Sequence, residues 1–258
     1  MSPFAWAQLG ILVGLVLLCA RPLGAYMADV YEGRRTPLVP VLGRVERWTY
    51  LSCGIDPDRE MDGREWATGL LIFSALGVFA TYALQRLQGG LPLNPQHVPA
   101  VSPDLAFNTA ISYATNTNWQ AYGGETVMSY ATQMLGLTVQ NFASAAAGMA
   151  ILVALCRGLA RHSATTLGNF WVDVVRGVLY VLLPLSVLLS VALVSQGVVQ
   201  TLRPYETASL VAPVRSADGR LVADQAIALG PAASQVAIKQ LGTNGGGFFG
   251  ANSAHPFE

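Results

Sequence analysis

Two polar strips in a chain dominated by membrane-length apolar segments carry residues suited to binding a dehydrated cation. The ten residues of these strips are Thr115, Asn116, Thr117, Asn118, Gly242, Thr243, Asn244, Gly245, Gly246 and Gly247. A potassium ion in a narrow filter must exchange its water shell for other oxygen atoms, and backbone carbonyls supply them. We expect the glycines to permit unusual backbone dihedral angles that aim successive carbonyls one way. Neither strip contains an acidic residue, which favours a carbonyl filter over a divalent-cation site.

The side chains of the strips have different expected roles. The hydroxyls of Thr115 and Thr243 add oxygen atoms, whereas Asn116, Asn118 and Asn244 are expected to brace the loops from behind by hydrogen bonds. Taken alone, the glycine-rich strip is also typical of an ordinary turn or of a phosphate-binding loop. A Walker A loop requires Gly-Lys-Ser/Thr, however, and the chain does not contain that sequence.

The two strips belong to an apparent internal repeat. A shift of 128 residues places Pro103 on Pro231, and Thr115 and Asn116 on the Thr-Asn pair of the second strip. Each strip follows a proline and a helix-capable run of about a dozen residues, which is too short to span a bilayer. The first such helix is predicted over 103–114, with the negative end of its dipole facing the strip. Lipid does not accept irregular backbone, so these loops must be buried in protein or line a watery cavity.

Composition indicates a membrane protein. The 258 residues are 52% hydrophobic and only 12% charged, with a mean hydropathy of +0.43, whereas soluble domains carry about 25% charged residues. The formal net charge is zero, so no nucleic-acid partner is expected. No metal site beyond the potassium ion is expected either, because the cysteines and histidines are isolated from one another. These residues are Cys19, Cys53, Cys156, His97, His162 and His255.

Arginine distribution predicts the topology. Seven arginines and eight acidic residues lie in 21–65, which indicates a cytoplasmic loop and an N-terminus outside. No basic residue precedes the first apolar run, which favours a retained helix over a cleaved signal peptide. The expected division is an N-terminal transmembrane helix over 1–20, a cytoplasmic loop over 21–65, a first helix–pore loop–helix repeat over 66–156, a cytoplasmic loop over 157–170 and a second repeat over 171–258 that stops after its pore loop.

Polar residues within the predicted spanning helices leave two readings open. One helix, expected over 124–156, has a face that either packs against neighbouring helices or lines a cavity below a filter. The residues of this face are Gln133, Leu137, Asn141, Ser144 and Gly148, with Gln140 adjacent. In the last predicted span, over 171–196, Asp173 and Arg176 are expected to form an interfacial ion pair, since they are spaced i, i+3. A polar external loop is then expected over 197–229.

Longer motifs occur along the chain. They are ARPLG (20–24), DREM (58–61), LPLNPQ (91–96), TNTNWQ (115–120), GETVMSY (124–130), GLTVQNF (136–142), LGNFWVD (167–173) and GTNGGGFFGANSAHPFE (242–258). Together these strings closely resemble a known family, the potassium-binding A subunit of the bacterial Kdp potassium-transporting ATPase. The resemblance runs along nearly the whole chain.

This resemblance implies an all-α polytopic membrane protein built from helix–pore loop–helix repeats, as in the superfamily of potassium transporters, with an extra N-terminal helix. It also implies a subunit of the bacterial plasma (inner) membrane that selects potassium from outside. The ion is then passed through an intramembrane tunnel to a P-type ATPase subunit, which hydrolyses ATP. The implied partners are that catalytic B subunit, a single-span C subunit, a small accessory peptide and the lipid bilayer. Potassium is the transported ligand, and no nucleotide is expected to bind this chain.

The chain departs from the family in length. A family member has four repeats, whereas this sequence is expected to supply about one and a half of them, which is the N-terminal half with two of four filter segments. We therefore expect that it cannot enclose an ion alone. The alternative reading is a truncated, non-conducting membrane protein that packs with partners but does not transport. An enzyme is disfavoured, because the ATPase phosphorylation signature Asp-Lys-Thr-Gly is absent from the sequence.

Overall fold

The computed structural model describes residues 2–161, 165–216, 218–256 and 258, and His162 lies outside these ranges. Four helical segments of the described chain are long and apolar enough to cross a membrane. They are Pro3–Tyr31, Gly63–Gly90, Thr132–Ala160 and Phe170–Ser195. The predicted helical membrane class is therefore confirmed.

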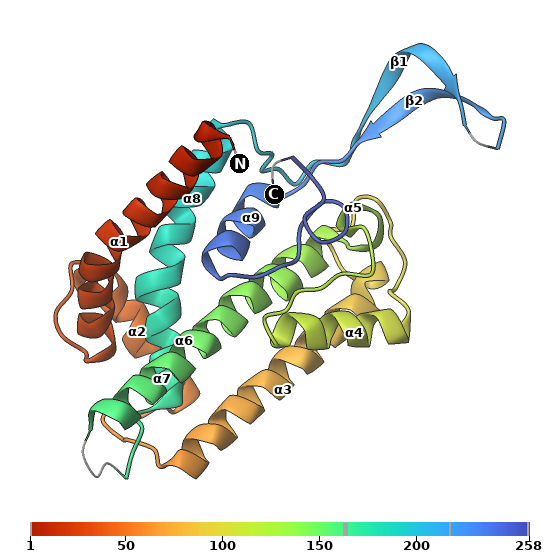
Figure 1. Cartoon of the computed structure of the whole chain (residues 1–258). Helices are drawn as coiled ribbons and strands as arrows, with labels where there is room; N and C mark the ends of the chain where they lie inside the picture. The colour runs from red at the N-terminus through yellow and green to blue at the C-terminus, as the bar shows by residue number, and fades with distance from the viewer. Residues whose placement is uncertain (1, 162–164, 217, 257) are drawn as a thin grey trace.

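The described residues form helices and one hairpin (Figure 1). The helical elements are α1 (Pro3–Tyr31), α2 (Val39–Cys53), α3 (Gly63–Leu87), η1 (Gln88–Gly90), α4 (Pro103–Ala114), α5 (Gly124–Val127), η2 (Thr132–Thr138), α6 (Val139–Ala160), α7 (Phe170–Arg176), η3 (Gly177–Leu182), α8 (Leu183–Ser195) and α9 (Ala232–Leu241). The antiparallel strands β1 (Glu206–Arg215) and β2 (Leu221–Ile227) project away from the helical body. They occupy the segment that was expected to be a polar external loop.

A helix interrupts the segment expected to be a loop over 21–65. Helix α1 continues to Tyr31 rather than ending near residue 20, and α2 follows it. The local signals for α2 are present in the sequence. Pro40 lies in its first turn, and Gly54 ends it with a φ of 64° in the left-handed region. The segment predicted as a cytoplasmic loop therefore contains helical residues, and its cytoplasmic location stays a prediction.

The span expected to be one helix over 124–156 is also interrupted. Its first turn is the short α5, after which Met128 is extended, and the chain then re-enters a helix through the π-helical turn η2. A second π-helical turn, η3, precedes Pro184 in the last span. Proline has no N–H to donate to the carbonyl four residues earlier, which belongs to Tyr180. The hydroxyl of Tyr26 donates to that carbonyl at 2.7 Å, so α1 is tied to the freed backbone group.

Small residues on α6 form the centre of the core. Ala146 and Ala150 are fully buried and belong to one apolar cluster with Phe170 and Val174 of α7 and Ile238 of α9. Alanines allow helix backbones to approach closely, as is usual in membrane helix bundles. Helix α6 therefore contacts α3, α4, α7 and α9, so both short helices pack against it, while α4 also packs against α3 and α9 against α8.

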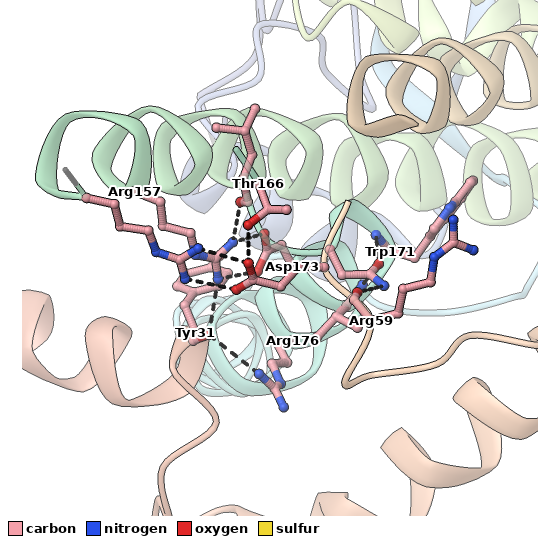
Figure 2. A network of polar contacts seen from close by, with 12 residues as sticks. Tyr31, Arg59, Arg157, Thr166, Trp171, Asp173 and Arg176 are labelled. Carbon is pink, nitrogen blue, oxygen red and sulfur yellow. Dashed lines mark hydrogen bonds and ion pairs between the residues drawn. The ribbon is translucent and has the colours of Figure 1, made fainter. Parts of the chain in front are cut away.

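A buried ion pair joins α6 to α7 at the end of the bundle far from the short helices (Figure 2). The guanidinium of Arg157 donates to both carboxylate oxygens of Asp173, at 2.5 and 2.9 Å. Arg176 instead donates to Glu46 of α2 at 3.0 Å. The predicted Asp173–Arg176 pair is therefore wrong. Sequence spacing along one helix does not reveal partners brought in by α6 and by α2.

Glu46 is the carboxylate that fixes α2 to the bundle. Its donors are the hydroxyl of Tyr180 at 2.6 Å, the hydroxyl of Tyr50 at 2.8 Å and the side chain of Arg176 at 3.0 Å. Burial alone raises the pKa of Glu46, but these hydrogen bonds and the nearby guanidinium outweigh it and hold the pKa below its ordinary value of 4.5. The ionised carboxylate therefore stabilises the folded state.

Glu46→Gln is expected to lower the thermal unfolding midpoint of the detergent-solubilised chain at pH 7. A carboxyl whose pKa is lowered by folding contributes stability above its unfolded pKa, and this contribution is lost as the pH falls. The difference in unfolding midpoint between the wild type and Glu46→Gln should therefore become smaller when the pH falls below about 4.5. Glu206→Gln, on the exposed strand β1, is the control and should show little gap at either pH. A gap that stays constant down to acid pH would contradict the prediction.

Candidate ion-binding loops

The first short helix ends in a turn that presents the first strip. Helix α4 begins at Pro103 and ends at Ala114, which confirms the predicted bounds. The N–H of Asn116 donates to the carbonyl of Tyr113 at 3.3 Å, and the N–H of Thr117 donates to the carbonyl of Ser112 at 3.1 Å. This pair of hydrogen bonds is the Schellman motif, which uses two of the carbonyls left unpaired at a helix C-terminus.

The second short helix, α9, ends in the same motif. The N–H of Thr243 donates to the carbonyl of Gln240 at 3.4 Å, and the N–H of Asn244 donates to that of Lys239 at 3.0 Å. The equivalent turn therefore closes 127 residues after the first, one fewer than the sequence repeat predicts. Thr243 thus takes the position of Asn116, with a φ of 57° against 62°. A β-branched residue in the left-handed region is a local strain of the kind that clusters at functional sites.

The last three of the four glycines in the second strip serve close packing. None of them has a φ in the left-handed region, so the expectation of unusual dihedral angles was wrong. A Cβ atom on Gly245 would lie 2.7 Å from the carbonyl oxygen of Thr117, and one on Gly246 would lie 2.9 Å from that of Asn118. A Cβ atom on Gly247 would collide with the carboxylate of Glu258. A side chain on Gly245 or Gly246 would therefore push the two strips apart.

The asparagines connect the strips to each other and to α6. The Nδ2 atom of Asn244 donates to the side-chain oxygens of Asn116 and, at 3.2 Å, of Asn118. Asn118 is fully buried, and its Nδ2 donates to Asn141 of α6 at 2.6 Å. Ser144, one turn further along α6, donates to Asn116 at 2.9 Å. The predicted bracing by asparagine hydrogen bonds is confirmed.

Alternate residues of the strips lie on an open face. Thr115, Thr117, Thr243 and Gly245 are exposed, whereas Asn118 is buried behind them. The hydroxyl of Thr115 donates to the carbonyl of Ile111 at 2.9 Å and lies 3.2 Å from that of Thr117. The threonine residues, with their hydroxyl oxygens, therefore lie on the open side of the strips, and amide side chains support the strips from within. That these oxygens bind an ion remains a prediction.

The polar face predicted on one long helix divides between two environments. Asn141 and Ser144 contact the first strip, and Gln133 of η2 donates to the carbonyl of Phe248 at 3.3 Å. Leu137 is buried, while Gly148 has open space beside its Cα atom. The half of the face nearest the loops therefore supports them directly, which favours a role beyond helix packing.

Gln120 is a loop-bridging residue that sequence reasoning missed. Its side-chain amide pairs with the backbone of Gly247 in both directions, at 3.0 Å to the carbonyl and 2.9 Å from the N–H. The same side-chain oxygen accepts from the N–H of Asn252 at 2.9 Å. A glutamine two residues after the first strip was the available signal, but its partners lie more than a hundred residues away in the chain.

These observations describe two loops, rich in amide and hydroxyl groups, at the C-termini of two short helices, and the comparisons with known proteins follow from here. Residues 10–258 match the family model of the potassium-transporting ATPase A subunit. The chain belongs to this family. The resemblance drawn from the sequence motifs is therefore confirmed, as is the assignment to a multi-pass membrane protein.

Three relatives illustrate the match, each named a potassium-transporting ATPase potassium-binding subunit. The protein of Methylococcus capsulatus is 60% identical over 95% of this chain and 44% of its own length. That of Herpetosiphon aurantiacus is 59% identical over 97% of this chain and 43% of its own length. That of Bordetella pertussis is 58% identical over 94% of this chain and 44% of its own length. The chain thus spans less than half the length of these relatives and corresponds to their N-terminal half.

Proposed function

We propose that this chain is the N-terminal half of the potassium-selecting, non-catalytic subunit of an ATP-driven potassium uptake complex. Potassium from the external side binds at a filter to which the two strips contribute oxygen atoms. It then passes to a P-type ATPase subunit, the catalytic B subunit, which assembles together with a C subunit and a small accessory peptide. The subunit lies in the bacterial inner membrane with its N-terminus outside, and it binds no nucleotide.

The observation that carries this proposal is the meeting of the two strips. They are far apart in the sequence, yet Asn244 donates to Asn116 and Asn118 across their junction. Both strips follow the C-terminus of a short helix, so two negative dipole ends face the same region. Neither strip contains an acid, so the expected selectivity device is a set of neutral oxygen atoms rather than a charge ring.

Gly246→Asp tests the proposal in a complete complex whose A subunit contains this chain. The new side chain would collide with the hydroxyl of Tyr113 and press on the carbonyl of Asn118, so it would displace both strips. We expect the KM for potassium, measured by potassium-stimulated ATP hydrolysis, to rise roughly tenfold, which corresponds to about 1.4 kcal/mol of lost binding.

The matched control is Gly63→Asp, in the exposed first turn of α3, where nothing lies within 4 Å of an added Cβ atom. It should leave the KM for potassium unchanged. If Gly246→Asp also leaves potassium affinity and sodium discrimination unchanged in an assembled complex, the filter assignment is wrong. The reading as a non-conducting membrane protein would then be favoured.

A further inference from the structure

A buried lysine lies beside the second strip. Lys239 of α9 is 1% exposed, although lysine is rarely found fully buried without a partner. Its ammonium donates to the carboxylate of Glu258 at 2.8 Å and to the hydroxyl of Ser253 at 2.8 Å. The side chains of the ion pair are 2% and 0% exposed, so water does not screen their charges. The resemblance to the family offered no role for this pair.

The carboxylate of Glu258 also holds the backbone that follows the glycines. Its Oε1 atom accepts from the N–H of Phe248 at 2.8 Å and from that of Phe249 at 2.7 Å. Its Oε2 atom faces Lys239 and fills the space in which a side chain on Gly247 would lie. One carboxylate therefore connects α9, the third glycine and the segment beyond it.

The charges of Lys239 and Glu258 also affect the electrostatic environment of the second strip. Lys239 lies in the last turn of α9, and its own carbonyl accepts from the N–H of Asn244. An ammonium at this place occupies the same negative helix end that would attract a cation in the strip. In a buried environment of low dielectric constant, an unpaired ammonium would repel potassium over several ångströms. Glu258 cancels that repulsion.

We propose that Lys239 and Glu258 form a positioning pair that fixes the second strip and keeps its surroundings electrically neutral for potassium. This inference rests on the proposed function. It adds two residues outside the ten of the strips, and it assigns them an effect on potassium affinity rather than on turnover. Because the effect depends on charge, loss of the carboxylate and loss of the ammonium act on affinity in opposite directions.

The test measures the KM for potassium and kcat in a complete complex whose A subunit carries each variant. Glu258→Gln leaves the ammonium unpaired, and we expect the KM to rise at least tenfold with kcat at saturating potassium unchanged. Lys239→Met leaves the carboxylate and is expected to keep the KM at or below the wild-type value. The double variant Lys239→Met/Glu258→Gln should return to within about threefold of the wild type. Asp218→Asn, in the exposed hairpin pair with Arg220, is the control and should change nothing.

Opposite effects of the two single variants support the charge-balancing role. Equal increases in KM for Glu258→Gln, Lys239→Met and the double variant would overturn it, because a purely mechanical contact fails in the same way in all three. If Glu258→Gln does not assemble, Lys239→Met decides, and an increase in its KM overturns the inference. If Gly246→Asp raises the KM for potassium and Glu258→Gln does not, this inference is rejected and the filter assignment stands. If neither variant raises the KM, the filter assignment is rejected as well.

Discussion

Replacing Asp173 with alanine is expected to destabilise the folded chain by about 3–5 kcal/mol, because it leaves a largely buried guanidinium without its carboxylate. The side chain of Asp173 is 1% exposed and that of Arg157 is 17% exposed. Arg157 also donates to the carbonyls of Leu167, at 3.1 Å, and of Tyr31, at 3.2 Å. These hydrogen bonds hold the guanidinium in place, so it cannot move to a solvent-exposed position when the carboxylate is removed.

The measurement is the unfolding midpoint of the detergent-solubilised chain with and without the substitution. Asp29→Ala is the matched control, because Asp29 pairs with Arg34 at the surface, where both side chains are 42% or more exposed. Exposed pairs of this kind contribute up to about 1 kcal/mol. Arg157→Met/Asp173→Leu should recover most of the stability, since it removes both charges together. Similar losses of stability for Asp29→Ala and Asp173→Ala would show that the buried pair contributes no more to stability than the exposed pair.

Helix α6 connects this ion pair to the strips. Arg157 lies near its C-terminal end, while Asn141 and Ser144 contact the first strip nearer its start. Arg157 and Arg176 both point to the carbonyl of Tyr31 at the end of α1 (Figure 2). The Arg157–Asp173 pair therefore fixes the long helices relative to one another at one end of the bundle. Helix α6, held at that end, positions the loops that contact its other end. Loss of Asp173 should consequently disturb the loops only through the position of α6.

Local signals in the sequence were sufficient for some elements of the fold. Pro103 at the start of α4 and the Thr-Asn pair after it predicted that helix with its observed bounds. The four candidate spans were evident from their apolar length. The start of α3 also follows local rules, since Asp62 caps it by accepting from the N–H groups of Arg64 and Glu65 at 2.8 Å.

Features that depend on tertiary contacts were not predictable from the sequence. The partner of Asp173 lies on α6 and that of Arg176 on α2, and no spacing rule connects them. The π-helical turn η2 follows an interruption at Met128 that no proline or glycine marks. Helix periodicity alone therefore predicted a continuous helix there.

The candidate site shows the same division. Its ten residues and the bracing by asparagines followed from residue types, because amides and hydroxyls after a short helix have few other uses in an apolar chain. The reason for three successive glycines did not follow, since the space is taken by Thr117, Asn118 and Glu258. Gln120 and Glu258 were missed for the same reason. Their importance lies in the distant backbone groups that they contact.

Asn118→Gly is expected to weaken potassium binding by a complete complex roughly 30-fold. It removes a buried hydrogen bond to Asn141 at 2.6 Å and a partly buried one from Asn244 at 3.2 Å, which together are worth about 2 kcal/mol when the partners are left unpaired. Glycine tolerates the φ of 54° observed at Asn118, so backbone strain does not contribute to the loss.

Under the proposed function, the ordered arrangement of the strips is the state that binds the ion, so free energy lost from that arrangement is lost from potassium affinity. The readout is the KM for potassium together with the concentration of sodium that competes. His97→Gly is the matched control, because His97 also has a positive φ, of 51°, but lies in an exposed loop. An assembled Asn118→Gly complex with wild-type affinity would mean that Asn116 and Asn244 hold the strips together without the link to α6. Selectivity would then depend on contacts between the strips alone.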